Sequence, residues 1–132
     1  MTELIDRIPY ARFIGAQVER TAHGLECVLP FHHDLVGNAA LPALHGGLLG
    51  AFLELTALLR LIDDARATGV PKPINFSVDY LRSAGPKTTR ARATIFKLGA
   101  RIANVHVVAW QDDESKPVVS GNGKFLLSTP SR

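Results

Sequence analysis

Glu54 is the residue in this sequence with the clearest capacity for chemistry. It is the only ionisable side chain in residues 46–59, a run that is apolar on nearly every side and therefore predicts a buried helix. An ionised carboxylate in such a helix is costly unless it is paired, hydrogen-bonded or given a raised pKa, and groups of this kind cluster at functional sites. Two interpretations follow: Glu54 acts on a substrate, or it forms a structural ion pair with an arginine or lysine from another strand or protomer.

His45, Gly46 and Gly47 stand directly in front of the apolar run. The amides of the two glycines become the first N–H donors of the helix, and such donors at a helix start can hold an anion or oxyanion. Glycine also lets a ligand carbonyl approach the backbone closely. The alternative is an ordinary helix start with permissive glycines.

The spacing of His45 and Glu54 limits how they could cooperate. They are nine positions apart, which on a helix is about 180° around the axis and roughly 13–14 Å along it. The two side chains therefore cannot meet within one chain. If both act on one substrate, the site combines the helix start of one subunit with Glu54 of its partner.

The rest of the sequence predicts the elements that position these groups. We expect a short N-terminal helix behind Thr2, interrupted at Pro9, and a hairpin closed by Gly24. The hairpin strands are expected at 15–20 and 24–29, a loop at 31–43, the central helix from 46 up to Gly69, and further extended segments at 74–82, 88–97, 101–111 and 117–127. One helix among strands predicts an α+β domain in which an antiparallel sheet curls around that helix.

Residues 102–110 indicate a second covered surface. Ala103, Val105, Val107 and Ala109 alternate with a second set that includes Ile102, Val108 and Trp110, so both faces of this strand are largely apolar. A sheet with one face in water alternates more cleanly. In a chain this short, we expect another copy of the same protein to cover the second face.

The composition fits one soluble domain spanning residues 1–132, since 46% of the residues are hydrophobic and 20% are charged. The single cysteine, Cys27, cannot form an internal disulfide, and no apolar leader core follows Met1, so we expect a cytoplasmic protein. The longest charge-free run, 35–53, contains Asn38, Pro42 and His45, which argues against a membrane helix and a membrane partner.

Other chemistries have weaker support. No Gly-x-Ser-x-Gly, P-loop or dinucleotide fingerprint occurs, which disfavours a serine hydrolase, an NTPase or a dehydrogenase. The adjacent His32, His33 and Asp34 lack further spaced ligands, so a surface position is expected rather than a metal site. We expect His106 to be hydrogen-bonded within a strand and Cys27 to be a small buried hydrophobe.

The combination of His-Gly-Gly with an acidic residue nine positions after the histidine, inside an apolar helix, resembles the hotdog-fold thioesterases of the phenylacetate-pathway and 4-hydroxybenzoyl-CoA type. The resemblance extends to the strand at 77–84, the turn at 97–101, and the closing strand at 118–127 with Gly121 and Gly123. It implies a hotdog fold, in which the sheet wraps one long helix. It also implies protomers that pair into a continuous sheet, and dimers that often form tetramers.

The resemblance also implies an activity, hydrolysis of an acyl-CoA to a free acid and CoA, without metal or bound cofactor. Glu54 would be the nucleophile or general base, the Gly46 amide would polarise the thioester carbonyl, and His45 would help to position it. Substrate contacts are implied at Asn38, Gly47, Tyr80, Arg82, Ser83, Lys97 and Arg101.

The charge pattern agrees with an anionic ligand. No acidic residue occurs between Asp79 and Asp112, whereas six of the fifteen basic residues fall there: Arg82, Lys87, Arg90, Arg92, Lys97 and Arg101. A patch of this kind could hold the phosphates of coenzyme A. The alternatives are a solvated sheet face and a nucleic-acid contact, and the absence of a nucleic-acid-binding motif disfavours the second.

Two departures from the family's pattern keep other functions open. Ala39 stands where the family usually has Asn or Gln, with Asn38 one position away, and Leu58 stands where some members have a hydroxyl that orients water. A non-catalytic protein that binds acyl thioesters is therefore the second hypothesis. A hotdog dehydratase or hydratase is the third, disfavoured because that branch pairs its acidic residue with a differently placed histidine.

Overall fold

The computed structural model describes residues 2–64 and 69–127. The N-terminal part contains helices α1 (Thr2–Ile5) and α2 (Pro9–Phe13) and strands β1 (Gln17–Thr21) and β2 (Gly24–Leu29). A 3-10 turn at His33–Leu35 and the short strands β3 (Val36–Asn38) and β4 (Ala43–Leu44) lead to helix α3 (Gly46–Asp63). The long strands follow as β5 (Lys72–Tyr80), β6 (Thr89–Leu98), β7 (Ile102–Trp110) and β8 (Val119–Leu126).

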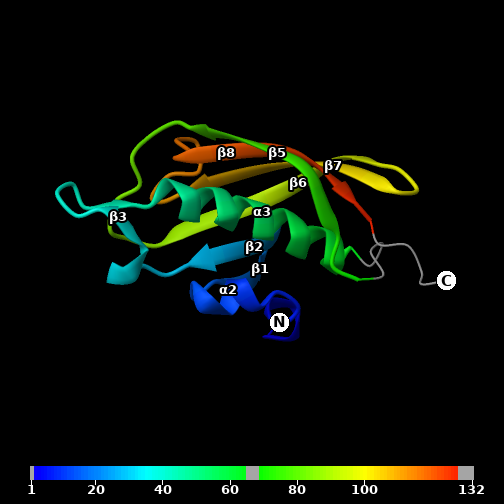
Figure 1. Cartoon of the computed structure of the whole chain (residues 1–132), viewed down its shortest axis with the longest axis horizontal. Helices are drawn as coiled ribbons and strands as arrows, with labels where there is room; N and C mark the ends of the chain where they lie inside the picture. Colours follow the sequence, from blue (N-terminus) through cyan, green and yellow to red (C-terminus); the bar gives the residue numbers. More distant parts are fainter. Residues whose placement is uncertain (1, 65–68, 128–132) are drawn as a thin grey trace.

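Six strands form one antiparallel sheet in the order β1-β2-β6-β7-β8-β5. Helix α3 lies across one face of this sheet, and α2 lies beside the β1 edge (Figure 1). The α+β architecture with a sheet around one long helix is the one that the sequence predicts. Strand β5 forms the edge opposite β1, which leaves one side of its backbone without a strand partner among the described residues.

The core lies between α3 and the inner face of the sheet. From the helix it contains Phe52, Leu53, Leu59 and Leu61, all fully buried. Small side chains on β6 and β7, including Ala91, Ala103 and Ala109, allow the helix to lie close to the sheet. On β8, a Cβ at Gly121 or Gly123 would lie within 2.7 Å of the Phe76 ring, so these glycines make room for the ring, which contacts Phe125 edge-on.

Several predicted elements are confirmed. The hairpin β1–β2 closes at Gly24, whose φ of 107° lies in the left-handed region that favours glycine. Pro9 separates two short N-terminal helices and begins the second. Helix α3 starts at Gly46 as predicted and ends at Asp63, whereas its expected extension falls partly on residues 65–68, outside the described residues.

The loop predicted at 31–43 is wrong in part. Val36–Asn38 pairs with Ala43–Leu44 in a small two-stranded sheet, with a bulge at Gly37. The reason is tertiary, because the His45 amide donates to the Leu35 carbonyl at 2.9 Å and ties this segment to the start of α3. Two very short strands carry no periodic pattern that sequence reasoning could use.

Both faces of β7 carry apolar residues, but only the face toward the helix is buried throughout. Ala103, Val105, Val107 and Ala109 are buried against the helix side. On the outer face Trp110 is also buried, in part because the Arg92 guanidinium lies 5.1 Å from its ring centroid, while Ile102 remains exposed. Cover by a second copy stays a prediction. Among the described helices, none is long and apolar enough to cross a membrane.

Candidate active site at the start of helix α3

His45 is the N-cap of α3, and its ring is held in one orientation. Its Nδ1 accepts a hydrogen bond from the Leu48 amide at 3.3 Å, an N-cap arrangement that satisfies one of the first helical donors. A Cβ at Gly37 would lie 3.0 Å from the ring's Cδ2, and one at Gly47 would lie 2.8 Å from its Cε1, so two glycines enclose the ring. Since Nδ1 accepts, the neutral ring carries its proton on Nε2, which is left as a donor.

The amides of Gly46 and Gly47 are the unpaired donors at this helix start. Within residues 2–64 and 69–127, neither amide donates a hydrogen bond to the chain, whereas those of Leu48 and Leu49 donate to His45. The positive end of the helix dipole adds to their attraction for negative charge. The structure thus provides two free backbone donors beside the His45 ring.

Tyr80 reaches this helix start from the end of β5. Its hydroxyl donates to the Gly46 carbonyl oxygen at 2.8 Å, and its ring lies 3.4 Å from the position of a Cβ on Gly46. Nothing in the sequence pairs residues 46 and 80, because the contact spans 34 positions and joins a strand end to a helix end. Tyr80, which the family resemblance assigns to the site, therefore also holds the backbone of Gly46.

Ser83, Arg82 and Asn38 lie around the same end of the helix. The Leu44 amide donates to the Ala84 carbonyl at 2.9 Å, which brings Ser83 close to the start of α3. Arg82 donates to the Pro117 carbonyl at 2.7 Å. Asn38 is exposed, and its Oδ1 accepts from the Ala40 amide at 3.1 Å, so its carboxamide closes its own turn.

Glu54 lies on the least covered side of α3, on the same stripe as Gly47, Gly50 and Ala51, which are also incompletely buried. Burial raises the pKa of the Glu54 carboxyl above its ordinary value. Among the described residues, no hydrogen bond or ion pair reaches this carboxylate. An ion pair with another strand is therefore not found among the described residues, and the functional interpretation of Glu54 stays a prediction beside a pair with another protomer.

A protein-family model described as the acyl-CoA thioesterase N-terminal domain matches residues 36–126, which include the helix start, Glu54 and strands β5–β8. The chain belongs to this family. The resemblance to hotdog thioesterases is thus confirmed, and with it the hotdog fold. No curated protein matches the chain.

Several solved structures share the fold of this chain. A protein from Chromobacterium violaceum is 39% identical, covers 98% of this chain and 90% of its own, and gives a TM-score of 0.77. A phenylacetic acid degradation-related protein from Ralstonia eutropha is 23% identical over 91% of both chains, with a TM-score of 0.76. A Bacillus halodurans protein solved with CoA is 18% identical, covers 98% of this chain and 91% of its own, and gives 0.76.

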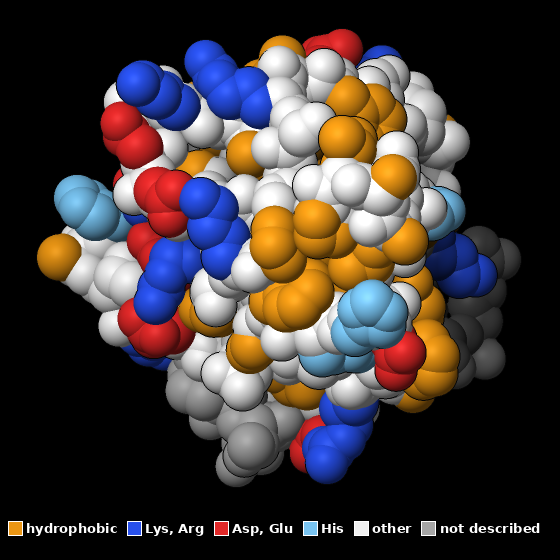
Figure 2. Space-filling model, turned by 90° about the vertical axis from the view of Figure 1, so that its left-hand side faces the viewer, with side chains coloured by type: hydrophobic (Ala, Val, Ile, Leu, Met, Phe, Trp, Pro, Cys, Tyr) orange, Lys and Arg blue, Asp and Glu red, His pale blue; other side chains and the backbone are white. Residues whose placement is uncertain are grey.

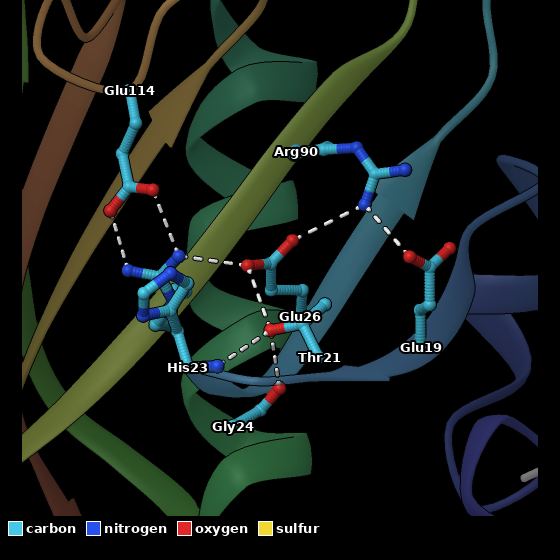
Figure 3. A network of polar contacts seen from close by, with 8 residues as sticks. Glu19, Thr21, His23, Gly24, Glu26, Arg90 and Glu114 are labelled. Carbon is cyan, nitrogen blue, oxygen red and sulfur yellow. Dashed lines mark hydrogen bonds and ion pairs between the residues drawn. The ribbon is translucent and has the colours of Figure 1, made fainter.

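The basic stretch of this hotdog chain does not form one patch, which corrects the expectation from the sequence. Arg90 and Arg92 contact carboxylates from other segments (Figure 3), and Lys87 pairs with Asp112. Glu114 and then Glu26 raise the pKa of the Arg92 guanidinium, and Arg92 lowers the pKa of the Glu114 carboxyl. The stretch between Asp79 and Asp112 contains no acidic residue, yet the fold brings carboxylates to half of its basic side chains.

Lys97 and Arg101 remain without a carboxylate partner in the described part of the chain, and they line a hollow of about 490 Å³. Lys124 on β8 lines the same hollow, a neighbour that sequence reasoning missed because it lies 23 residues beyond Arg101. The register pairs Ile102 with Leu126 and Ala109 with Val119. Since a strand rises about 3.3 Å per residue, the hollow lies roughly 23 Å from the helix-start end of the sheet.

The surface at the helix-start end is apolar in its middle, with basic and acidic side chains mixed along one side (Figure 2). Exposed apolar residues of the segments that meet there are Leu41, Tyr80 and Leu81. A thioester with an apolar acyl group would therefore meet apolar side chains as it approaches the helix start.

The remaining predicted residues have structural roles. His106 Nδ1 and Asn122 Oδ1 lie 2.8 Å apart, and Cys27 is fully buried, as expected from the sequence. Burial raises the pKa of the Cys27 thiol to about 12. His32 and His33 are exposed, and no group of three His, Cys, Asp or Glu that could hold a metal occurs in the described part.

Proposed function

We propose that this protein is an acyl-CoA thioesterase, which hydrolyses an acyl-CoA to a free acid and CoA. The observation that carries the proposal is the half-buried Glu54 carboxylate, which has a raised pKa and no partner among the described residues. Membership of an acyl-CoA thioesterase family and the CoA bound to the Bacillus halodurans structure support this substrate class.

Glu54 can act in two ways. As a nucleophile it attacks the thioester carbonyl, expels the CoA thiolate and forms a mixed anhydride that water then hydrolyses. As a general base it takes a proton from a water that attacks the same carbonyl. Both routes need the ionised carboxylate, and in both the thiolate leaves with a proton from the site or solvent.

The start of α3 supplies the other half of the chemistry. As the carbonyl is attacked, negative charge develops on its oxygen, and preorganised N–H donors stabilise that charge. The unpaired amides of Gly46 and Gly47 are such donors, and the Nε2–H of His45 is a third group that can position the oxygen. No metal or cofactor is needed in this scheme.

The two halves come from different protomers in our proposal. Along α3, Glu54 is roughly 12 Å from Gly46, too far for the two to act on one carbonyl within a protomer. In the described part of the chain, strand β5 is an edge with unpaired backbone groups, and it carries the exposed Ile74 and Tyr80. Antiparallel pairing of two β5 strands would set the helix start of one protomer against the later part of the partner's helix.

Lys97, Arg101 and Lys124 are proposed to hold the phosphates of CoA. They lie at the far end of the sheet from the helix start of their own protomer, which the same antiparallel pairing would place beside the partner's helix start. Changing Lys97 or Lys124 to Gln should raise KM for acyl-CoA much more than KM for a short pantetheine thioester. The exposed Lys116, outside this hollow, is the matched control.

A protein that binds acyl thioesters without hydrolysing them is the second candidate. The observation in its favour is that residue 58, one helical turn beyond Glu54, is a buried leucine, and that the Thr56 hydroxyl is engaged in donating to the Phe52 carbonyl at 2.7 Å. Such a protein would keep the pocket and the phosphate contacts but would lack a residue to orient water.

Thiol release from aryl-, short-, medium- and long-chain acyl-CoAs tests the proposed function. We expect steady turnover of at least one substrate and none with the Glu54→Gln variant. Tight binding of CoA thioesters without thiol release would favour the binding protein. Sedimentation should show a dimer or tetramer, and a stable folded monomer at micromolar concentration would contradict the composite site.

A further inference from the structure

Tyr80 acts on the backbone of the helix start, and its position suggests why. Strand β5 ends where α3 begins (Figure 1), and the Tyr80 hydroxyl donates to the Gly46 carbonyl oxygen at 2.8 Å. Its side chain packs over the start of the helix, since a Cβ at Gly46 would lie 3.4 Å from the ring and one at Gly50 would lie 3.5 Å from the hydroxyl. The contact is half exposed, so it is not part of the core.

The Gly46 carbonyl belongs to the same peptide unit as the Gly47 amide. A trans peptide is planar, so its C=O and N–H point in opposite directions and turn together. A group that holds the Gly46 oxygen therefore also sets the direction of the Gly47 N–H. A hydrogen bond accepted at the carbonyl further polarises the unit and makes its N–H a stronger donor.

The helix start needs such a clamp because of its composition. Gly46 and Gly47 have no side chains, and the backbone of glycine can adopt more conformations than that of any other residue. The His45 ring already holds the Leu48 amide, whereas the amides of Gly46 and Gly47 make no hydrogen bond among the described residues. Within α3 the Gly46 carbonyl accepts the helical hydrogen bond from the Gly50 amide, and the Tyr80 hydroxyl adds a second hydrogen bond to the same oxygen.

We propose that Tyr80 is a positioning residue that orients and polarises the Gly46–Gly47 peptide, so that the Gly47 N–H is aimed at the developing oxyanion of the substrate. The inference rests on the proposed thioesterase function for its consequence in turnover, but not for the geometry itself. The Tyr80 hydroxyl then acts through the backbone and not on the reacting thioester.

Tyr80→Phe tests the proposal because it keeps the ring over the glycines and removes only the hydroxyl. Loss of a whole oxyanion donor costs about 10²–10³ in kcat. Weakening one should lower kcat about tenfold while KM stays within about twofold, the pattern of an interaction made in the transition state. The other tyrosine of the chain, the exposed Tyr10 on α2, provides the matched control, and Tyr10→Phe should leave both constants unchanged.

A measurement on the peptide itself keeps the test independent of activity. Gly46-Gly47 is the only Gly-Gly pair in the sequence, so protein made with glycine labelled with ¹³C at the carbonyl and with ¹⁵N gives a single correlation between adjacent residues. In Tyr80→Phe, the Gly46 carbonyl and the Gly47 amide proton should both shift upfield. The Tyr10→Phe spectrum should match that of the wild type.

Three results would overturn the proposal. One is a Gly47 amide that is unchanged in Tyr80→Phe, even if the Gly46 carbonyl moves. Another is a raised KM with unchanged kcat, which would mean that the hydroxyl contacts the substrate. The third is unchanged kcat and KM. If the wild-type protein hydrolyses no acyl-CoA, the proposed function fails, and the Gly47 resonance still decides whether Tyr80 positions the peptide.

Discussion

Glu26 on β2 and Glu54 on α3 are both withdrawn from water, but the fold surrounds them differently. Glu26 is only 5% exposed, and its carboxylate accepts from Arg92 at 2.8 Å, Arg90 at 3.2 Å and Thr21 at 3.3 Å (Figure 3). Glu54 is half-buried and has no such partner among the described residues. One carboxylate is compensated on several sides, and the other is left with a raised pKa.

The difference separates a carboxylate that stabilises the fold from one that is available for chemistry. Ion pairs and hydrogen bonds offset the cost of removing the Glu26 charge from water, so this network can stabilise the sheet. Among the residues that the structure describes, no contact offsets that cost for Glu54, which means that the fold tolerates a carboxylate that binds protons more tightly. Removing each charge should therefore have opposite consequences for activity and stability.

Glu54→Gln should have the largest effect. The change keeps the shape and removes the ionisable group, so turnover of the best acyl-CoA should fall by at least about 10²-fold, the usual scale for losing a general base. Steady-state thiol release measures kcat, and the affinity for CoA should be unchanged. Unchanged turnover in a folded variant would move the catalytic role to another part of the molecule.

Glu26→Gln should have the reverse signature. It weakens charge-assisted hydrogen bonds to Arg90 and Arg92, and the free energy of unfolding should fall by about 2 kcal/mol. The loss is moderated because both arginines keep a second carboxylate, Glu19 and Glu114. Thermal unfolding at one protein concentration measures it, and kcat should change little. A variant as stable as the wild type would show that the network contributes nothing.

The difference in stability between the wild type and the Glu54→Gln variant should depend on pH. Burial raises the folded-state pKa of Glu54 above its ordinary value of 4.5, so the folded chain binds this proton more tightly than the unfolded chain. Wild-type stability then falls as pH rises from the ordinary value through the raised one. The variant should therefore have the higher Tm at pH 7, and the difference should vanish below pH 4.5. A lower Tm at pH 7 would indicate an ion pair in the assembled protein.

Glu114→Gln should have the smallest effect. Glu114 is largely exposed and contacts only the Arg92 end of the network, with its two oxygens 2.5 Å and 2.9 Å from the guanidinium. Solvent screens such a pair, and the free energy of unfolding should change by less than about 1 kcal/mol. Denaturant unfolding beside Glu26→Gln measures the contrast. An equal loss in both variants would mean that burial does not set the strength of these pairs.

Local pattern was enough to predict α3, its start at His45-Gly46-Gly47 and the isolated Glu54. The hairpin at Gly24 and the long strands were predicted on the same basis, within about two residues at most ends. Apolar periodicity, turn residues and caps act over a few positions, so these features are written in adjacent residues. The small sheet at 36–44 was missed, because its pairing depends on the contact between Leu35 and His45.

Tertiary structure decided which charges and donors are used. The acid-free stretch predicted one basic patch, but Glu26 meets Arg92 across 66 positions of sequence and Asp112 meets Lys87 across 25. In the same way Tyr80 finds the Gly46 carbonyl, and Lys124 joins Lys97 and Arg101. Antiparallel pairing sets these neighbours through strand order and register, which no local pattern encodes. The sequence by itself determined which groups could react, and the sheet determined which of them stay unpaired.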